Sequence, residues 1–345
     1  MDLALSADQL ATSELASRLF GREVTPALIR SCEQPGHSPA LWSTLVESGI
    51  PGMGVAPDLG GGGADLSILA IVAEEAGRTI APVPLVEHLV ATRLLARTQP
   101  GHPRLAELVA GEAIATLAVQ PARQGVARLV PAGAVAHLVV ALDGDDLVAV
   151  DAPPAGIAPD NHASAPVADR PLDVGDRLVL ARGPAALEAN AWAIDEWRVL
   201  TAAALTGLAR AALDLAVDYV KQRHQFGVPI GSFQAVQHGL ADLPGEVVGS
   251  HLLVQEAAWA LDSGLAAPTG ASGPELASMA FLFAGELARD ATARCVQYHG
   301  GYGVAEEYDA QLLYRRARGW PLLLGDPAYE LQHLGELLVD DGREA

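Results

Sequence analysis

The sequence predicts an α+β protein that is mostly α, with a helical domain over residues 1–112, a small β domain over 113–187 and a four-helix bundle domain over 188–345. Near both ends of the chain, apolar residues recur at steps of three and four, the period of helices packed on a core. The middle instead has short Val- and Leu-rich runs between Pro, Gly and Asp clusters, which is typical of strands. A length of 345 residues also favours more than one structural unit.

The first domain is predicted to contain several helices. Ser6 predicts the cap of the first, and residues 41–49 predict another. Four consecutive glycines at 60–63 exclude helix there. Because no GK[ST] follows them and no strong strand precedes them, they do not indicate a phosphate-binding P-loop.

The second domain is predicted to be a small antiparallel sheet. The acidic stretch Asp143 to Asp146 lacks the spacing and terminal Glu of an EF-hand, so we interpret it as a solvated hairpin turn and not as a calcium site. The predicted strands cover residues 114–119, 127–130, 137–142, 146–150 and 177–180.

The third domain returns to helices, each of which needs a partner because it carries an apolar stripe. A connection at 262–268 separates the two stripes. One consists of Leu205, Leu208, Ala212, Leu215 and Tyr219, and the other of Leu276, Ala280, Phe283, Leu287 and Ala291.

Composition excludes several classes of function. A formal net charge of −20 argues against binding nucleic acid or an anionic membrane surface, and a phosphate-bearing ligand would have to be met by local Arg or Lys or by helix N-termini. No apolar run reaches the roughly 18 residues of a membrane span, and no secretory signal is visible at the start, so we expect a cytoplasmic protein. Cys32 and Cys295 are far apart and lack partner ligands; we expect packed thiols, with neither a disulfide framework nor a metal site.

The most informative stretch is residues 223–238, Arg-His-Gln-Phe-Gly-Val-Pro-Ile-Gly-Ser-Phe-Gln-Ala-Val-Gln-His, which lies between two amphipathic helices. Its Gly and Pro residues interrupt the helical period, while Phe226, Ile230 and Phe233 anchor it. We therefore expect an ordered turn that holds Arg223 and several amides in place. Taken alone, Arg223 would be interpreted as a surface ion-pair partner.

This stretch resembles the RxxFGxxIxxFQ segment of the acyl-CoA dehydrogenase flavoproteins. A second match follows about 70 residues later, in Gln-Tyr-His-Gly-Gly-Tyr-Gly at 297–303, with Leu-Tyr-Arg-Arg-Ala at 313–317. Two motifs in the expected order make the resemblance specific. It extends over nearly the whole chain and is weakest in the middle domain.

The resemblance implies an acyl-CoA dehydrogenase-like fold and FAD as the cofactor. In that family one subunit reaches across a dimer interface to hold the adenine and pyrophosphate end of its neighbour's FAD. The residues to which the resemblance assigns this role are Arg223, Gln225, Phe226, Phe233, Gln234, Gln297, Gly300 and Gly301. Arg offers a planar fork to a diphosphate, and glycines allow close backbone approach.

The catalytic Glu of the family is missing from its usual positions. The family chemistry needs a carboxylate that removes the α-proton of an acyl thioester while hydride passes to the flavin. At its usual position, after residues 315–317, this chain has Leu324, or Leu323, and at the alternative position it has Trp197. Glu196 is the candidate that remains, one residue and about 100° of helix away. Its other interpretation is a first-turn carboxylate favoured by the helix dipole.

The flavin-contacting segment of the β domain also departs from the family pattern, since Val119 stands where a hydroxyl is expected. Elements lent to a neighbour's FAD are thus kept, while those that bind the flavin ring and abstract the proton are altered. The resemblance therefore implies the shorter subunit of a heteromeric acyl-CoA dehydrogenase of the actinobacterial steroid side-chain type, in a heterotetramer with a homologous subunit that supplies the Glu. The implied substrate is an acyl-CoA, and electrons would pass to an electron-accepting flavoprotein or its equivalent.

Two alternatives stay open from the sequence. One is a self-sufficient homotetrameric acyl-CoA dehydrogenase that uses Glu196 or another carboxylate. The other is a flavin-free paralogue that binds acyl-CoA or acts as a scaffold.

Overall fold

The computed structural model describes residues 5–340, and its chain divides into two compact units. One contains Ala70–Ala81, the chain from Val199 onward and the N-terminal stretch up to Pro26; the other contains Ala27–Leu69 and Pro82–Arg198. The division into three domains, with boundaries at 112 and 187, follows the type of element and not the contacts, and it stays a prediction.

The second unit contains two sheets. Strands β2 (Val126–Val130) and β5 (Ala168–Pro171) pair in a separate two-stranded sheet. The larger sheet has the order β1-β3-β4-β6, from β1 (Ala115–Leu117), β3 (Leu138–Asp143), β4 (Asp146–Asp151) and β6 (Asp176–Arg182). Because β1 runs parallel to β3, the prediction of a purely antiparallel sheet is wrong at this edge, and β5 was missed.

The acidic stretch between β3 and β4 is the hairpin turn that the sequence predicts. Asp143 pairs with Asp146 across a two-residue link in which Gly144 has φ of 62°. Asp143 of β3 and Asp146 of β4 form ion pairs with two arginines of β6, Arg177 at 3.1 Å and Arg182 at 3.6 Å. Cross-strand ion pairs of this kind are partly exposed and contribute little to stability.

Helices cover the rest of the second unit. A buried His88 joins three of its elements: Nε2 donates to Leu108 O (3.1 Å) and Nδ1 accepts from the Ala115 N–H (3.1 Å). Burial lowers the pKa of His88 to about 4, so the ring is neutral at pH 7. The helical elements are α2 (Pro26–Ser31), α3 (Pro39–Glu47), η1 (Pro57–Leu59), α5 (Leu85–Thr98), α6 (Leu105–Val109) and the first part of α7 (Pro184–Gln222).

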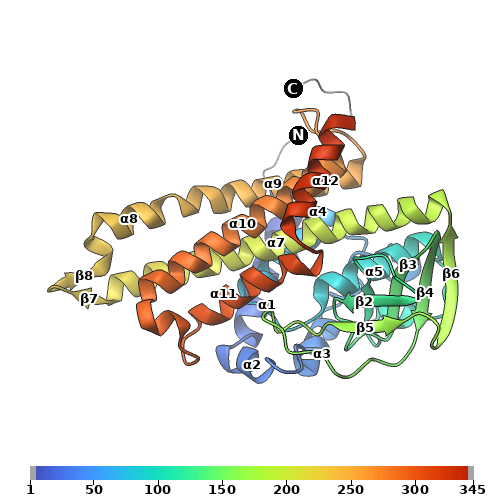
Figure 1. The fold of residues 1–345 in the computed structure, drawn as a ribbon, viewed down its shortest axis with the longest axis horizontal. Coiled ribbons are helices and arrows are strands. Elements are labelled where there is room, and N and C mark those ends of the chain that lie inside the picture. Colours follow the sequence, from blue (N-terminus) through green and yellow to red (C-terminus); the bar gives the residue numbers. More distant parts are fainter. Residues whose placement is uncertain (1–4, 341–345) are drawn as a thin grey trace. The chain divides into compact units, whose positions relative to one another are not determined.

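The first unit is helical apart from one small hairpin, and Figure 1 shows α7, α9 and α10 running alongside one another with that hairpin, β7 and β8, at one end. Ser6 caps α1 (Ala7–Glu23) through a capping box with Gln9, which confirms the predicted helix start. The remaining elements are α4 (Leu66–Arg78), α8 (Gln234–Ala241), α9 (Leu243–Ser263), α10 (Gly273–His299), η3 (Gly300–Val304), α11 (Ala310–Gly319), η4 (Pro321–Leu323) and α12 (Pro327–Asp340).

Helices α4 and α7 cross closely enough that only glycine fits at the contact. A Cβ at Gly207 would overlap the carbonyl of Glu74, and one at Gly77 would overlap the carbonyl of Ala204. The Glu74 carboxylate beside this crossing is 4% exposed, forms an ion pair with Arg210, and lies 2.7 Å from Nδ1 of His251. Backbone packing and a buried charge cluster therefore hold the two helices together.

Most of the predicted apolar stripes are buried. Leu205, Leu208 and Ala212 of α7 have no exposed surface, but Phe283 of α10 is 41% exposed, and the neighbouring Phe281 takes the buried position instead. Among residues 5–340, α7 is the one helix long and apolar enough to cross a membrane, and most of its apolar stretch is buried, as in the core helix of a folded protein.

Candidate functional site

The turn that follows α7 is a short β-hairpin. Strand β7 (His224–Gln225) pairs antiparallel with β8 (Val228–Pro229), and the Ile230 N–H donates to Arg223 O (2.8 Å). The two linking residues, Phe226 and Gly227, have φ of 54° and 83°. Both are left-handed, as a two-residue turn of the primed type requires, so the ordered turn predicted from the sequence is present.

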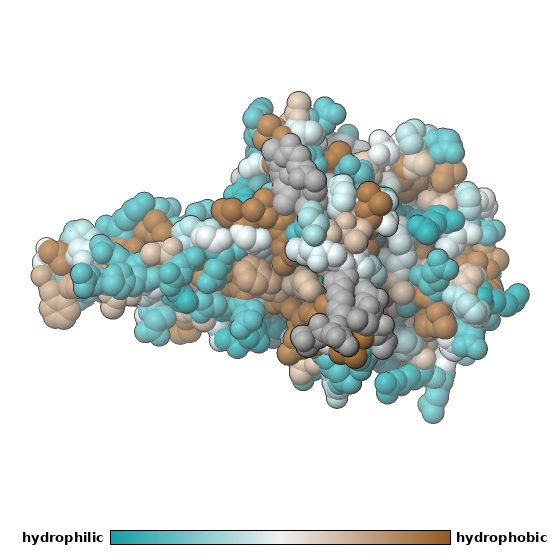
Figure 2. Space-filling view, turned by 90° about the horizontal axis from the view of Figure 1, so that it is seen from above, coloured by the Kyte–Doolittle hydropathy of each residue, from teal (hydrophilic) through white to brown (hydrophobic). Residues whose placement is uncertain are grey.

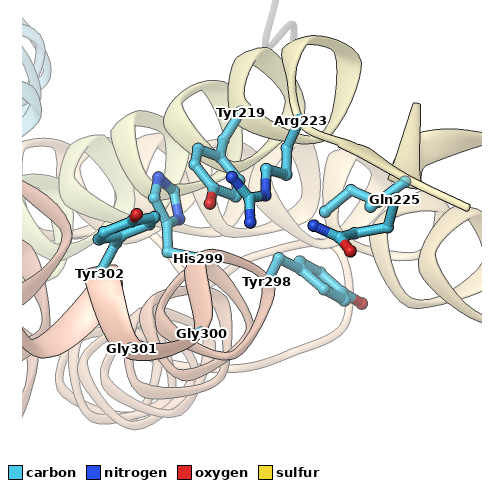
Figure 3. A pocket seen from close by; sticks show the side chains of 9 residues that line it. Tyr219, Arg223, Gln225, Tyr298, His299, Gly300, Gly301 and Tyr302 are labelled. Carbon is cyan, nitrogen blue, oxygen red and sulfur yellow. The ribbon is translucent and has the colours of Figure 1, made fainter. Parts of the chain in front are cut away.

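A groove of about 530 Å³ lies between this hairpin and the end of α10 (Figure 3). In Figure 3 the side chains of Arg223 and Gln225 point from α7 and β7 toward the segment that carries Gly300 and Gly301. The lining residues are Tyr219, Arg223, Gln225 and Ile230 on one side, and Tyr298, His299, Gly300, Gly301 and Tyr302 on the other.

Arg223 provides the positive charge of the groove. Its guanidinium carbon lies 5.9 Å from the ring centroid of Tyr302, which stacks on Tyr308 at 4.9 Å. None of the ion pairs formed between residues 5 and 340 involves Arg223. The planar fork of donors is therefore available to an anionic ligand.

His299 forms part of the groove wall. Its ring stacks on Tyr219 with centroids 4.0 Å apart, and Nδ1 donates to Cys295 O (2.7 Å). Cys295 has no exposed surface, and burial raises the pKa of its thiol to about 12. Cys32 is also buried. Both thiols are packed side chains, as the sequence predicts.

The two glycines leave the groove open on the α10 side. Gly300 has φ of 61° and ψ of −137°, a backbone conformation that is almost closed to other residues. A Cβ at Gly300 or Gly301 would have no atom of this chain within 4 Å, whereas one at Gly303 would meet Val296 O at 2.6 Å. Gly303 is thus explained by packing within the chain, while the space beside Gly300 and Gly301 admits a ligand close to the backbone.

The structure brings together half of the predicted cofactor-binding residues. Arg223, Gln225, Gly300 and Gly301 line one groove; Phe226, Phe233, Gln234 and Gln297 are exposed and lie outside its lining. Tyr219 and Tyr302 of the lining were not predicted to bind the cofactor, although the sequence placed Tyr219 in an apolar stripe and Tyr302 in the second motif. Tyr219 is four residues before Arg223 and so shares its helix face, a spacing that offers a signal for finding it.

The positions where the family carries its base are apolar and buried. Leu324, which follows η4, is 9% exposed and Trp197 is 1% exposed. The Glu196 carboxylate is 1% exposed and is held by the Arg93 guanidinium through contacts of 2.6, 3.0 and 3.1 Å. Glu196 as a base stays a prediction; because both of its carboxylate oxygens bind Arg93, this geometry favours a structural role.

A planar cation, an amide side chain, aromatic rings and an open glycine backbone are groups that can bind a diphosphate and an aromatic base. With the mostly helical fold and the small β domain, they fit the class of enzymes that bind a dinucleotide. Family models identify the class of protein more closely. The N-terminal domain model of acyl-CoA dehydrogenases matches residues 6–99, and the C-terminal domain model matches residues 187–338. The chain therefore belongs to the acyl-CoA dehydrogenase family, whose members are oxidoreductases acting on CH–CH bonds.

Individual relatives extend over the whole chain. The acyl-CoA dehydrogenase IpdE2 of Mycolicibacterium smegmatis is 32% identical over 338 residues, which is 96% of this chain and 98% of that protein. The Tcur3481–Tcur3483 steroid ACAD, solved as a variant, superposes with a TM-score of 0.83 at 28% identity over 98% and 99% of the two chains. The ChsE4–ChsE5 complex from Mycobacterium tuberculosis gives a TM-score of 0.87 at 23% identity, again over 98% and 99%, and shows the fold alone. These matches confirm the predicted fold class.

Proposed function

We propose that this chain is the partner subunit of a heteromeric acyl-CoA dehydrogenase that introduces a 2,3 double bond into a bulky acyl-CoA. In this assembly it completes an interfacial FAD site, while a homologous subunit supplies the catalytic Glu. The observation that carries the proposal is the pairing of an open groove at Arg223 and Gly300 with buried apolar residues, Leu324 and Trp197, at both positions of the family base.

The hairpin beside the groove has the surface of an interface. Phe226 is 93% exposed, Val228 40% and Phe233 38%, and Figure 2 shows a small apolar patch at the tip that carries β7 and β8, with hydrophilic surface around it. Large exposed apolar residues next to a ligand groove are typical of surfaces that another subunit covers. A groove built at such a surface favours a ligand shared between subunits.

The residues of the groove fit the nucleotide half of FAD, the cofactor of this family. Arg223 would bind the diphosphate through its fork, Gln225 would donate from its amide, and Tyr302 and Tyr219 offer faces on which a base or ribose can pack. Gly300 and Gly301 would let the diphosphate approach the backbone. When bound, FAD supplies the acceptor for the hydride that leaves the β-carbon of the substrate.

A partner is required by the proposal because this chain lacks a free carboxylate where the family places one. Two structures of the same fold are named for pairs of proteins, Tcur3481 with Tcur3483 and ChsE4 with ChsE5, and the former is called a steroid ACAD. By analogy with it, the bulky acyl group is proposed to be part of a steroid. The acceptor of the electrons is proposed to be a flavoprotein, as the family resemblance implies. The protein is proposed to act in the cytoplasm.

The decisive experiment compares the visible absorption spectra of the chain purified alone and co-purified with a homologous partner. A colourless chain that becomes yellow in the pair, with one flavin per pair, is the expected result. Full FAD occupancy of the chain alone, with bleaching on addition of acyl-CoA, would overturn it in favour of a homotetramer. Absence of flavin from every complex would overturn it in favour of an acyl-CoA-binding scaffold.

Two further measurements test whether the groove binds FAD and whether the hairpin lies at the interface between subunits. Arg223→Met should lower the flavin content of the pair, while Arg18→Met, on a surface arginine of α1 that is 73% exposed, should leave it unchanged. Lys221, the sole lysine of the chain, is exposed one residue before α7 ends, so an amine-directed label reports on the hairpin. We expect Lys221 to be labelled in the isolated chain and protected in the pair; equal labelling in both would place the interface elsewhere.

A further inference from the structure

A second cavity adjoins the hairpin, a pocket of about 390 Å³ between α7, β8, η2 (Ile230–Ser232) and α8. It is separate from the groove, because neighbouring residues divide between the two: Ile230 lines the groove, whereas Pro229 and Gly231 line the pocket. Gly231 lets η2 lie directly on α7, since a Cβ there would come within 3.1 Å of Val220 O. The apolar lining of this apolar pocket consists of Val217, Val220, Pro229, Gly231, Val236 and Leu240.

The two uncharged polar residues of the apolar pocket use their donors within the chain. Ser232 Oγ donates to Pro229 O (2.7 Å), and Gln237 Nε2 donates to Gly231 O (3.0 Å). An ordered water makes about two to four hydrogen bonds, and a polar small molecule is held by several converging polar groups. This lining offers few such groups, so the pocket favours an apolar occupant.

Lys221 is the one charged residue of the apolar pocket. It is exposed at the end of α7 and joins no ion pair within residues 5–340. The nearest carboxylates along α7, Asp214 and Asp218, are exposed and do not line the pocket. An apolar group that carries a carboxylate beside it therefore matches both the lining and its charge.

The apolar pocket has the size for one large side chain. A cavity of roughly 150 Å³ holds a benzene ring, so about 390 Å³ with an opening to solvent holds an aromatic or a branched side chain. Side chains seated in pockets of this kind carry much of the binding energy of subunit interfaces. The pocket belongs to the hairpin whose tip is Phe226, 93% exposed, so a subunit that covers this tip lies next to the pocket.

The charge of the hairpin favours a different subunit over a second copy of this chain. Lys221 and Arg223 lie two residues apart, and a two-fold contact through the hairpin would bring these cations of both copies together. Like charges placed opposite each other weaken binding. A homologous subunit of different sequence can instead place a carboxylate opposite Lys221, so it is the occupant that fits best.

We propose that the apolar pocket receives one large apolar side chain of the homologous partner subunit, and that a carboxylate of the partner beside this side chain pairs with Lys221. The inference rests on the proposed function for the identity of the partner. It adds a second contact to that interface: the groove would hold the shared cofactor, and the apolar pocket would hold the subunits together.

The first test fills the apolar pocket from within the chain. Val217→Phe places a ring in the cavity, so the Tm of the isolated chain should stay the same or rise, while the Kd of the pair should rise at least about tenfold. Val174→Phe is the matched control, because this valine is 54% exposed and outside the lining, and it should leave the Kd unchanged. An unchanged Kd in Val217→Phe, with normal flavin content, would overturn the pocket contact while the proposed function stands.

The second test removes the charge and leaves the fold intact, because the Lys221 side chain is exposed. Lys221→Met should raise the Kd of the pair about threefold or more and make association less dependent on salt. Lys221→Arg, which keeps the charge, should preserve both. An unchanged Kd and an unchanged salt dependence in Lys221→Met would overturn the ion pair.

A third measurement identifies the occupant. Cys32 and Cys295 are buried, so a photoreactive maleimide should label Ser232→Cys at position 232 alone. In the pair, the crosslink should reach a segment of the partner subunit that has a large apolar residue with Asp or Glu within about one helical turn.

Two outcomes would give the apolar pocket to another occupant and overturn the proposal. One is a crosslink to a second copy of this chain. The other is binding of octanoate, an apolar chain with a carboxylate, to the assembled pair in a way that Val217→Phe abolishes. A colourless pair that shows the expected crosslink would refute the proposed FAD site and support the pocket contact.

Discussion

Phe226 has a left-handed backbone conformation that is unfavourable for an aromatic residue. A substitution at this position can therefore change the stability of the isolated chain and its affinity for a partner subunit in opposite directions. The left-handed region costs an L-residue about 1–2 kcal/mol, and Asn tolerates it far better than an aromatic residue. In this chain Phe226 recovers little, since it is 93% exposed and contacts Phe233 only edge-on at a centroid distance of 6.3 Å. Phe226→Asn should therefore stabilise the isolated chain by up to about 1 kcal/mol.

The same substitution should weaken assembly. If a partner covers the ring, about 150 Å² of aromatic surface at about 25 cal/mol per Å² corresponds to about 4 kcal/mol, of which ordering and desolvation on binding remove a part. A net loss of about 2 kcal/mol raises the Kd of the pair about 30-fold. An unfavourable backbone conformation that contributes nothing to the free chain, like that of Phe226, is expected at a residue that contacts a partner subunit.

The assay combines thermal unfolding of the isolated chain with titration of the partner subunit. Phe226→Leu is the control, because it keeps an apolar side chain and the strain, so we expect no gain in Tm and a smaller loss of affinity. A higher Tm with unchanged Kd would show that the partner does not cover this residue. A lower Tm in Phe226→Asn would refute the argument from backbone strain.

Three further predictions concern stability. Burial raises the pKa of Glu87 to about 7 from 4.5, so the native state holds the proton between these pH values and loses stability as the pH rises through 7. Glu87→Gln should therefore stabilise the protein by about 1–3 kcal/mol at pH 8 and by little at pH 4, which paired Tm measurements at the two pH values would check. Gly207→Ala should cost about 3 kcal/mol or more, because its Cβ overlaps the Glu74 carbonyl and forces α4 from α7, and a Tm within 2 °C of wild type would contradict that packing. Arg170 is 4% exposed and donates to four backbone carbonyls at 2.8–3.2 Å, so Arg170→Lys should lower the urea midpoint clearly, whereas Arg128→Lys on an exposed ion pair should not.

The elements that sequence reasoning predicted best are those with local signals. The cap at Ser6 and the turn at Asp143 each depend on residues within a few positions of one another. Strand β5 was missed because its four residues, Ala-Asp-Arg-Pro, have neither β-branched nor aromatic character. The parallel pairing of β1 with β3 joins segments more than 20 residues apart, and nothing in either segment encodes it.

The candidate site likewise contains some residues that sequence motifs predicted and others for which the sequence held no signal. Arg223, Gln225, Gly300 and Gly301 were found because two sequence motifs resemble one family, and the structure shows that they line one groove. The contact between Arg93 and Glu196 spans 103 positions, so the sequence offered Glu196 only as a candidate base or a first-turn carboxylate and gave no reason to single out Arg93. A charge can be recognised in a sequence, whereas its partner is decided by folding.

The charges at the hairpin make it one place on this acidic chain where a polyanion can bind. With 42 acidic and 22 basic residues, the protein as a whole repels phosphates, and many of its arginines are neutralised in ion pairs such as Arg104 with Asp151. Arg223 and the sole lysine, Lys221, lie two residues apart at the end of α7, and neither joins an ion pair within residues 5–340. Because unpaired positive charge on an acidic protein acts over about one Debye length, roughly 8 Å in physiological salt, a diphosphate would be attracted at this end and repelled by the acidic surface elsewhere. Flavin binding to the pair should therefore weaken as salt is raised, and Arg223→Met should remove most of that dependence.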